Sequence, residues 1–435
     1  MGGGNQRGHR YKIGKVMYAL VDCNNFYVSC ERVFNPGLRD KPVIVLSNND
    51  GCAISRSEEA KALGVEMGAV PHLMPPELRR QVQMFSSNYT LYGDMSDRVM
   101  STLATFVPQM EIYSIDEAFL DMNELKYQDL QKLGITIRRT VLKNIGIPVC
   151  VGIAPTKALA KMANRFAKKQ RKLLGVHSAC TEQQVHEMLD WCPVNDVWGI
   201  GRQYAAMLQK NGIRTALQFA QAPDDFVRAK MSVVGLRLQK ELNGIPCIEW
   251  EFEPPAKKGI CTGRSFGKLL TEKKDIAEAL SNYAAVCAHK LRQQHSVAKV
   301  LRVFINTNPH RADDPQYFRS IALQFAVPSA DTPVVIKYAL KALDMIFKEG
   351  HKFMKCGVEL VNLVPNDQVQ MSLFAPAGDP RRKKAVATMD KLNNQLGKDL
   401  VRFGIQGFER SYKARAAHLS PCYTTRLDDI IKTKN

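Results

Sequence analysis

The sequence predicts a multidomain α+β protein built around a ferredoxin-like sheet. Its 435 residues exceed the roughly 250–300 residues at which a single hydrophobic core stops growing. An apolar content of 45% beside 24% charged residues is typical of a globular chain. Over residues 16–170 the signals follow the order strand, helix, hairpin, helix, strand, which is the order of a split βαβ sheet.

The elements of this sheet follow from local patterns. An apolar run at 16–21 predicts a buried strand that ends at Asp22. Two short runs of β-branched and aromatic residues, Met110 to Ile115 and Ala118 to Met122, predict a hairpin. The remaining expected elements are a helix at Leu130 to Lys143, a strand at Val149 to Ile153 and a helix from Thr156.

The acidic pair Asp116-Glu117 lies at the tip of that hairpin, inside an otherwise apolar stretch. An acidic surface turn is the simplest interpretation of the pair alone. Two adjacent carboxylates repel each other, so a rigid acidic tip is favoured where a divalent cation neutralises it. The predicted topology can bring Asp22 beside this tip. Three carboxylates at one sheet edge can hold two Mg²⁺ ions about 3.5–4 Å apart, a spacing that serves phosphoryl transfer.

Charge is distributed unevenly along the chain. A net charge of +19 and a pI near 9.4 favour a polyanionic partner, such as nucleic acid or an anionic membrane surface. Residues 85–125 hold seven acids against one base, whereas residues 157–172 hold seven bases and no acid. An acidic centre flanked by basic surface suits a metal-dependent enzyme that acts on phosphates. A solvated basic helix face is the alternative interpretation of the second run.

Several classes of protein are disfavoured. No apolar run reaches the roughly 18 residues that span a bilayer, and the first residues lack the apolar core of a signal peptide. We therefore expect a soluble intracellular protein, with residues 1–15 as a disordered extension. The eleven cysteines show no zinc-finger spacing, so we expect reduced thiols.

Two ordered motifs identify a family. The segments Val21-Asp22-Cys23-Asn24-Asn25-Phe26-Tyr27 and Tyr113-Ser114-Ile115-Asp116-Glu117-Ala118-Phe119 resemble the palm of Y-family translesion DNA polymerases. Three further segments resemble the UmuC-type members of that family, namely Leu46 to Cys52, Phe85 to Tyr89 and Asp196 to Gly201. The resemblance extends from Met17 to Lys432 and so covers nearly the whole chain.

The resemblance implies a division into polymerase domains. The expected boundaries are 1–15 for the extension, 16–37 with 85–170 for the palm, 38–84 for the fingers, 171–245 for the thumb, 246–258 for a linker, 259–364 for an α/β little finger and 365–435 for a tail. In the thumb, Gly199-Ile200-Gly201 has the form of a helix-hairpin-helix turn. The backbone amides of Gly199 and Gly201 could bind a DNA phosphate there without reading bases.

The tail contains a short apolar motif. Gln370-Met371-Ser372-Leu373-Phe374 resembles the sliding-clamp-binding peptide, in which two large apolar side chains fill a pocket of the clamp. Met371 departs from the more common Leu. Beyond this motif, Ser420 to Thr425 resembles the C-terminal extension of UmuC-type proteins, whose role the sequence does not indicate.

By the same resemblance, three carboxylates are the catalytic residues and hold two Mg²⁺ ions. Asp22 and Asp116 would bridge both ions, while Glu117 would serve the ion at the primer end. The backbone carbonyl of Cys23 would be a further metal ligand.

The resemblance also implies how the chain holds a nucleotide. Tyr27 matches the steric gate, a ring beneath the sugar that leaves no room for a 2′-hydroxyl. Cys52 and Ile54 would cover the nascent base pair. In this family the side chains that cover the base pair are small and the active site is open, which would admit damaged templates.

The expected triphosphate-binding bases are Lys61, Lys168 and Arg56. Here the chain departs from the family, which often has Tyr-x-x-Arg where this chain has Glu58-Glu59-Ala60-Lys61. Glu58 lacks an aromatic hydroxyl, and Lys61 cannot form the bidentate fork of an arginine. We therefore expect nucleotide affinity to depend more on Lys168 and Arg56.

These inferences lead to one hypothesis and three alternatives. The hypothesis is a template-directed DNA polymerase that performs translesion synthesis in the SOS response. Its implied partners are primer-template DNA, dNTPs, the sliding clamp, processed UmuD-like subunits and RecA. The expected location is the bacterial cytoplasm, at the nucleoid and away from membranes. The helix-hairpin-helix and the clamp-like peptide disfavour a nucleotide cyclase, and Tyr27 disfavours a nuclease. A non-catalytic scaffold for DNA and the clamp is the third alternative, although it would not need three carboxylates.

Overall fold

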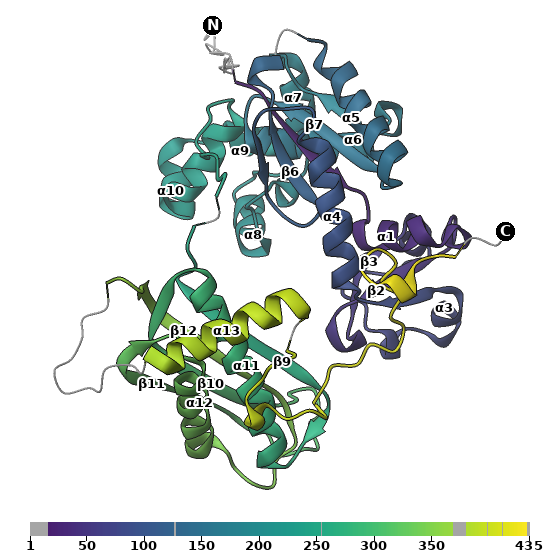
Figure 1. Cartoon of the computed structure of the whole chain (residues 1–435). Coiled ribbons are helices and arrows are strands. Elements are labelled where there is room, and N and C mark those ends of the chain that lie inside the picture. The colour runs from purple at the N-terminus through teal and green to yellow at the C-terminus, as the bar shows by residue number, and fades with distance from the viewer. Residues whose placement is uncertain are drawn as a thin grey trace, which may run out of the picture. The chain divides into compact units, whose positions relative to one another are not determined.

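The computed structural model describes residues 16–125, 128–253, 255–368, 380–397, 399–410 and 412–432 (Figure 1). They form two compact units, which are described separately. The first contains the described residues within 1–47, 51–254 and 418–435, and the second those within 48–50 and 255–417. The chain therefore returns to the first unit at residue 418. The expected extension at 1–15 and the clamp-like peptide at 370–374 lie outside the described residues.

A five-stranded sheet lies at the centre of the first unit. Its strands are β1 (Tyr18–Cys23), β5 (Met110–Ile112), β6 (Glu117–Asp121), β7 (Val149–Ala154) and β8 (Val176–Ser178), in the order β5-β6-β1-β7-β8. Neighbours are antiparallel except for the parallel pair β7 and β8. All of β7 is buried, as is β1 except at Asp22. The predicted α+β class is confirmed, and Asp22 is the polar position of the central strand.

The hairpin that carries the acidic pair is shorter than the sequence predicts. Strand β5 ends at Ile112 instead of Ile115. The amides of Tyr113 and Ser114 both donate to the carbonyl oxygen of Glu117, at 3.0 and 3.1 Å, and these bonds form a turn in place of further ladder. Asp116 therefore lies in the turn, and Glu117 is the first residue of β6.

Three helices flank this sheet, namely α4 (Tyr89–Leu103), α5 (Leu130–Ile145) and α6 (Lys157–Lys169). Helix α5 begins after its cap Asp129 and ends at Gly146, whose φ of 81° is accessible to glycine. Helix α6 contacts β7 and β1. A Cβ at Gly152 of β7 would lie 2.0 Å from the amide nitrogen of Asn164, so glycine is required for this close approach. The packing sets one face of α6 beside the strand that carries Asp22.

A second sheet in this unit has three strands, β2 (Val43–Leu46), β3 (Ala53–Arg56) and β4 (Gln83–Ser86), in the order β3-β2-β4. Helix α1 (Phe26–Phe34) follows β1 and contacts β2 and β3. It begins after Asn25, whose φ of 47° is a left-handed conformation that asparagine tolerates. Two short helices, α2 (Glu58–Ala62) and α3 (Pro76–Gln81), complete this part.

Four further helices of the first unit follow the sheet in sequence, namely α7 (Glu182–Trp191), α8 (Arg202–Lys210), α9 (Ala216–Ala220) and α10 (Asp224–Leu242). Their buried apolar residues share one core with α6 and with Tyr18, Leu20 and Phe119 of the sheet. The stretch Gly199 to Gly201, for which the sequence predicts a helix-hairpin-helix turn, lies between α7 and α8.

The second unit is a four-stranded antiparallel sheet with helices. Its strands are β9 (Gly259–Leu270), β10 (Ser296–Thr307), β11 (Phe318–Ser329) and β12 (Phe353–Pro365), in the order β11-β10-β12-β9. Helices α11 (Lys273–Gln293) and α12 (Thr332–Ile346) contact the sheet and share its apolar core. Helix α13 (Pro380–Leu396) is joined to α11 by an ion pair between Asp390 and Arg292 at 2.6 Å. The exact boundaries expected for palm, fingers, thumb and little finger stay predictions.

Across the described residues, no helix combines the length and the apolar character that crossing a membrane requires.

Candidate functional site

The sheet brings the predicted carboxylates to one place. Asp22 of β1 lies directly opposite Glu117 of β6 in the antiparallel register. Asp116 precedes β6, and its carbonyl oxygen accepts the amide of Cys23 at 2.9 Å. The Ser114 hydroxyl donates to Oδ1 of Asp116 at 2.5 Å and so orients its carboxylate. Residues that are distant in the sequence therefore meet at the end of the central strand.

One face of α6 supplies positive charge to this acidic end. Its bases at 157, 161, 165 and 168 follow helical spacing and lie on one side of the helix. Lys168 forms an ion pair with Asp22, and Lys161 contacts Oε2 of Glu117 at 2.9 Å. The Lys161 ammonium also lies 4.2 Å from the ring centroid of Tyr113, a cation–π contact. Two bases of the run, Lys161 and Lys168, are therefore turned toward the acidic centre.

Lys157 departs from the expectation of a basic surface. Its side chain is only 1% exposed and its Nζ lies 2.6 Å from Oε2 of Glu111 on β5. The same ammonium donates to the carbonyl oxygen of Glu249 at 2.6 Å. Neither interpretation of the run foresaw this burial, because the partners come from segments far away in the sequence.

Burial and charge control the ionisation of Asp22. The pKa of the Asp22 carboxyl is raised to about 6: burial is the largest cause, the adjacent Lys168 lowers the pKa, and the neighbouring Glu117 raises it. A carboxylate that is costly to ionise when left alone is stabilised by a nearby cation.

The donor atoms of this site fit a hard divalent cation. Carboxylate oxygens are the ligands that Mg²⁺ prefers, and two lysine ammonium groups already place positive charge against Asp22 and Glu117. Over the ranges that the structure describes, no three Asp, Glu, His or Cys side chains converge into a preformed metal-binding group. The lysines and Ser114 hold the three carboxylates individually instead.

Lys61, an expected triphosphate ligand, has partners within the protein. Its Nζ donates to Oε1 of Glu58 at 2.6 Å and to Oδ1 of Asn25 at 2.7 Å. The Asn25 amide also donates to Glu58 at 3.1 Å. Burial raises the pKa of Glu58, but the hydrogen bonds from Lys61 and Asn25 outweigh it and lower the pKa. Glu58 thus neutralises Lys61 within the protein.

The other expected nucleotide-binding residues lie on or beside the three-stranded sheet. Ile54 and Arg56 belong to β3, and Cys52 precedes it. The Cys52 amide donates to the Ser47 hydroxyl at 3.2 Å. Arg56 donates from Nη1 to the carbonyl oxygen of Val65 at 2.6 Å, which orients its guanidinium toward the protein's own backbone.

Tyr27 is the second residue of α1 and belongs to an aromatic cluster. Its ring stacks on Tyr92 with centroids 4.6 Å apart and contacts Tyr89 edge-on at 6.0 Å. The ring is partly exposed, whereas Tyr92 is fully buried. Part of the Tyr27 ring is therefore accessible, while Tyr92 of α4 packs against one face of the ring.

The glycines expected to contact DNA lie just before α8. Gly199 has a φ of 86°, which only glycine adopts readily. Gly201 is the N-cap of α8, and no side chain caps the helix there. A Cβ on Gly201 would meet nothing within 4 Å. The clamp-like residues 370–374 lie outside the described part, so their placement stays a prediction.

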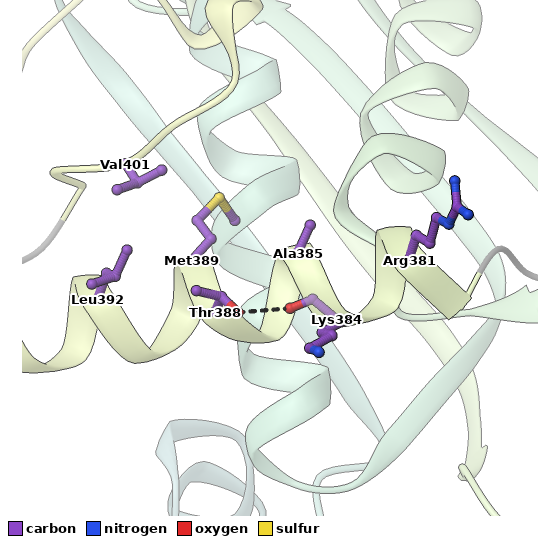
Figure 2. Close-up of a pocket in the computed structure, with 7 residues that line it drawn as sticks. All are labelled: Arg381, Lys384, Ala385, Thr388, Met389, Leu392 and Val401. Atoms are coloured by element: carbon purple, nitrogen blue, oxygen red, sulfur yellow. Dashed lines mark hydrogen bonds between the residues drawn. The ribbon is translucent and has the colours of Figure 1, made fainter.

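A separate apolar groove runs along α13 in the second unit (Figure 2). It is lined by Arg381, Lys384, Ala385, Thr388, Met389, Leu392 and Val401. Figure 2 shows Met389, Leu392 and Val401 facing the same space. The groove contains none of the residues singled out in the sequence, and nothing in the structure shows what covers it.

Sequence reasoning missed a buried polar network beside Tyr27. Glu31 of α1 is buried and accepts hydrogen bonds from Tyr92 and Ser420. An acid that follows buried Cys30 in an apolar helix was the available signal for Glu31. No local pattern points to Ser420 as its partner.

Family models match most of the chain. A model described as the impB/mucB/samB family matches residues 21–165, and a model of that family's C-terminal domain matches residues 257–373. A domain of unknown function, DUF4113, matches residues 383–432. The first match includes Asp22, Asp116 and Glu117, and the last includes Ser420.

Individual proteins show the same similarity. The chain is 42% identical to the protein UmuC of Salmonella typhimurium, over 96% of this chain and 100% of that protein. It is 27% identical to DNA polymerase IV 1 of Bacillus subtilis, over 88% of this chain and 91% of that protein. A solved Y-family DNA polymerase chimera of Dbh and Dpo4 shares the fold, with a TM-score of 0.61 and 21% identity over 80% of this chain and 100% of that chain.

Proposed function

Because the chain belongs to the impB/mucB/samB family, that is, to the UmuC-type Y-family DNA polymerases, we propose that it extends primers across damaged templates during the SOS response. One observation carries the proposal. Asp22 pairs in register with Glu117, and Asp116 is bonded beside them, in a chain that is 42% identical to UmuC over 96% of its length.

The carboxylates would hold two Mg²⁺ ions. Asp22, Asp116, Glu117 and the carbonyl oxygen of Cys23 would be their ligands. When bound, such ions activate the primer hydroxyl and neutralise charge on the triphosphate. The protein's contribution is to fix the donors, because β1, β6 and the Ser114 hydroxyl hold the carboxylates on a rigid sheet.

Lys168 is the base best placed to meet the triphosphate. Its side chain is partly exposed near the end of α6 while its ammonium contacts Asp22. A flexible ammonium in this position can neutralise the carboxylate and reach a phosphate oxygen. Lys61 is held by Glu58 and Asn25, so its contribution to nucleotide binding is expected to be smaller.

The remaining parts of the chain support binding to DNA and to protein partners. The uncapped start of α8 at Gly201 would bind a phosphate of the primer-template. Residues 370–374 would bind the sliding clamp. Similarity to UmuC supports processed UmuD-like subunits as further partners. We also propose RecA as a partner and a place at the nucleoid in the bacterial cytoplasm.

A primer-extension assay tests the proposed function. The full-length protein, supplied with Mg²⁺, each dNTP and the UmuD-like and RecA partners, should extend a primer on an intact template and past an abasic site. Removal of Mg²⁺ with a chelator should abolish extension, because the carboxylates would then lack the cation that neutralises the triphosphate. Tight DNA binding without any extension would instead support the non-catalytic scaffold.

Replacing Tyr27 with alanine should reduce discrimination between dCTP and CTP roughly tenfold to a hundredfold, because the ring's steric clash with a 2′-hydroxyl is removed. The measurement is the ratio of kcat/KM for the two nucleotides opposite the same template base. Tyr27→Phe keeps the ring and should keep the ratio. An unchanged ratio in Tyr27→Ala would refute the assignment of the gate.

A further inference from the structure

The C-terminal segment 418–423, within the domain of unknown function, is an integral part of the first unit. In Figure 1 the yellow end of the chain runs beside α1. The His418 amide donates to the Ser86 hydroxyl at 2.9 Å, and the Ser86 amide donates to the His418 carbonyl oxygen at 2.9 Å. Tyr423 stacks on Phe34 of α1 with ring centroids 4.8 Å apart. The segment is thus attached to both β4 and α1.

This segment also holds the residue that starts α4. Asn88 is the N-cap of α4, and its Oδ1 accepts the amide of Leu91 at 3.2 Å. Its Nδ2 donates to the carbonyl oxygen and the hydroxyl of Ser420, at 3.0 and 3.1 Å, and to the carbonyl oxygen of Pro421 at 3.2 Å. One asparagine therefore joins the tail to the helix that carries Tyr89 and Tyr92.

A second connection passes through a buried carboxylate. Oε1 of Glu31 accepts the hydroxyl of Tyr92 at 2.7 Å and the hydroxyl of Ser420 at 2.9 Å. The donors Tyr92 and Ser420 are 0% and 6% exposed, so water does not readily replace either donor. Loss of one donor to a buried carboxylate is costly, and the remaining partner is then held less firmly.

The ring of Tyr92 supports the ring of Tyr27. The two rings are stacked at 4.6 Å with an interplanar angle of 21°, and Tyr89 touches both edge-on at 6.0 and 6.3 Å. A ring can exclude a hydroxyl sterically only if it cannot retreat, so its support matters as much as its size. The support of Tyr27 is anchored by Glu31, which in turn is bonded to Ser420.

We propose that residues 418–423 form an internal clasp that holds Tyr92, and through it Tyr27, so that Ser420 contributes to the selection of deoxyribonucleotides. The proposal rests on the proposed function, because it takes Tyr27 as the sugar gate. Ser420 touches no substrate in this proposal and is a positioning residue. The domain of unknown function then has a role inside the nucleotide site of its own chain.

The test compares Ser420→Ala with the unaltered full-length protein. The dCTP to CTP ratio of kcat/KM should fall roughly threefold to tenfold, because only part of the free energy of the lost hydrogen bond to Glu31 is transmitted to the Tyr27 ring. Tyr92→Phe keeps the stacked ring but removes the other donor to Glu31, and it should lower the ratio similarly. Leu419→Ala is the matched control, because Leu419 lies in the same segment with its side chain 52% exposed; its ratio should match the unaltered protein.

Combination with Tyr27→Ala separates positioning from general damage. Without the gate ring, adding Ser420→Ala should leave the ratio unchanged. An equal further fall in that background would overturn the proposal, as would unchanged ratios in both Ser420→Ala and Tyr92→Phe. If a thermal unfolding measurement shows that Ser420→Ala does not fold, the dCTP to CTP ratio of Tyr92→Phe tests the proposal instead. An unchanged dCTP to CTP ratio in Tyr27→Ala would contradict the assignment of Tyr27 as the gate. A lower ratio in Tyr27→Ala, together with unchanged ratios in both Ser420→Ala and Tyr92→Phe, would contradict only the clasp.

Discussion

Replacing Asp116 with alanine should reduce primer extension roughly a thousandfold or more while largely sparing DNA binding. Under the proposed function, several kcal/mol of transition-state stabilisation would depend on cations held by the carboxylates, and each 1.36 kcal/mol corresponds to about a factor of ten in rate. Asp116 lies in a turn with its carboxylate oriented by Ser114, so its loss removes a proposed metal ligand without opening the apolar core. Single-turnover extension and a DNA-binding titration on the same preparation measure the two effects.

Asp97→Ala is a matched control for the lost charge. Asp97 is an exposed acid of α4, and its removal should change extension by less than about twofold, as expected for a surface position. Retained synthesis by Asp116→Ala would eliminate the three-carboxylate assignment. Equal losses of DNA binding and of extension would indicate a structural role for Asp116 instead.

Replacing Lys157 with methionine should destabilise the first unit by about 3–5 kcal/mol, because it leaves the Glu111 carboxylate buried without its cation. The pair is close, at 2.6 Å, and Lys157 is 1% exposed. The amide of Glu251 also donates to Glu111 Oε2 at 2.8 Å, so one carboxylate oxygen ties together β5, α6 and the segment after α10. Urea unfolding followed by tryptophan fluorescence measures the change, since Trp250 lies 4.9 Å from the Lys157 ammonium.

Two further variants isolate the cause. Lys169→Met removes an exposed lysine from the same helix, and it should change stability by no more than about 0.5 kcal/mol. Adding Glu111→Gln to Lys157→Met removes the unpaired charge but keeps an oxygen that accepts the Glu251 amide, so most of the lost stability should return. A similar loss in the single and the double variant would show that packing of the lysine stem, rather than the unpaired charge, is responsible.

Local sequence signals predict most elements of the sheet region, although not all of their bounds. The sequence predicts helix α5 at Leu130 to Lys143, and the helix runs from Leu130 to Ile145, because its periodicity and its flanking Asp129 and Gly146 are local features. The hairpin was predicted too long, since turn hydrogen bonds to the Glu117 carbonyl replace ladder pairing after Ile112. The functional roles of the site residues stay predictions that the experiments above test.

By itself, the sequence determined the α+β class and the meeting of Asp22 with the acidic hairpin, because acidic residues at the ends of apolar strands stand out and topology limits where they lie. Only the tertiary structure decided the partners of the charged and polar side chains. It buries Lys157 against Glu111, pairs Lys61 with Glu58 and Asn25, and bonds Ser420 to Glu31 across 389 positions of sequence. Such contacts depend on packing between distant segments, and no periodicity or spacing within either segment records them.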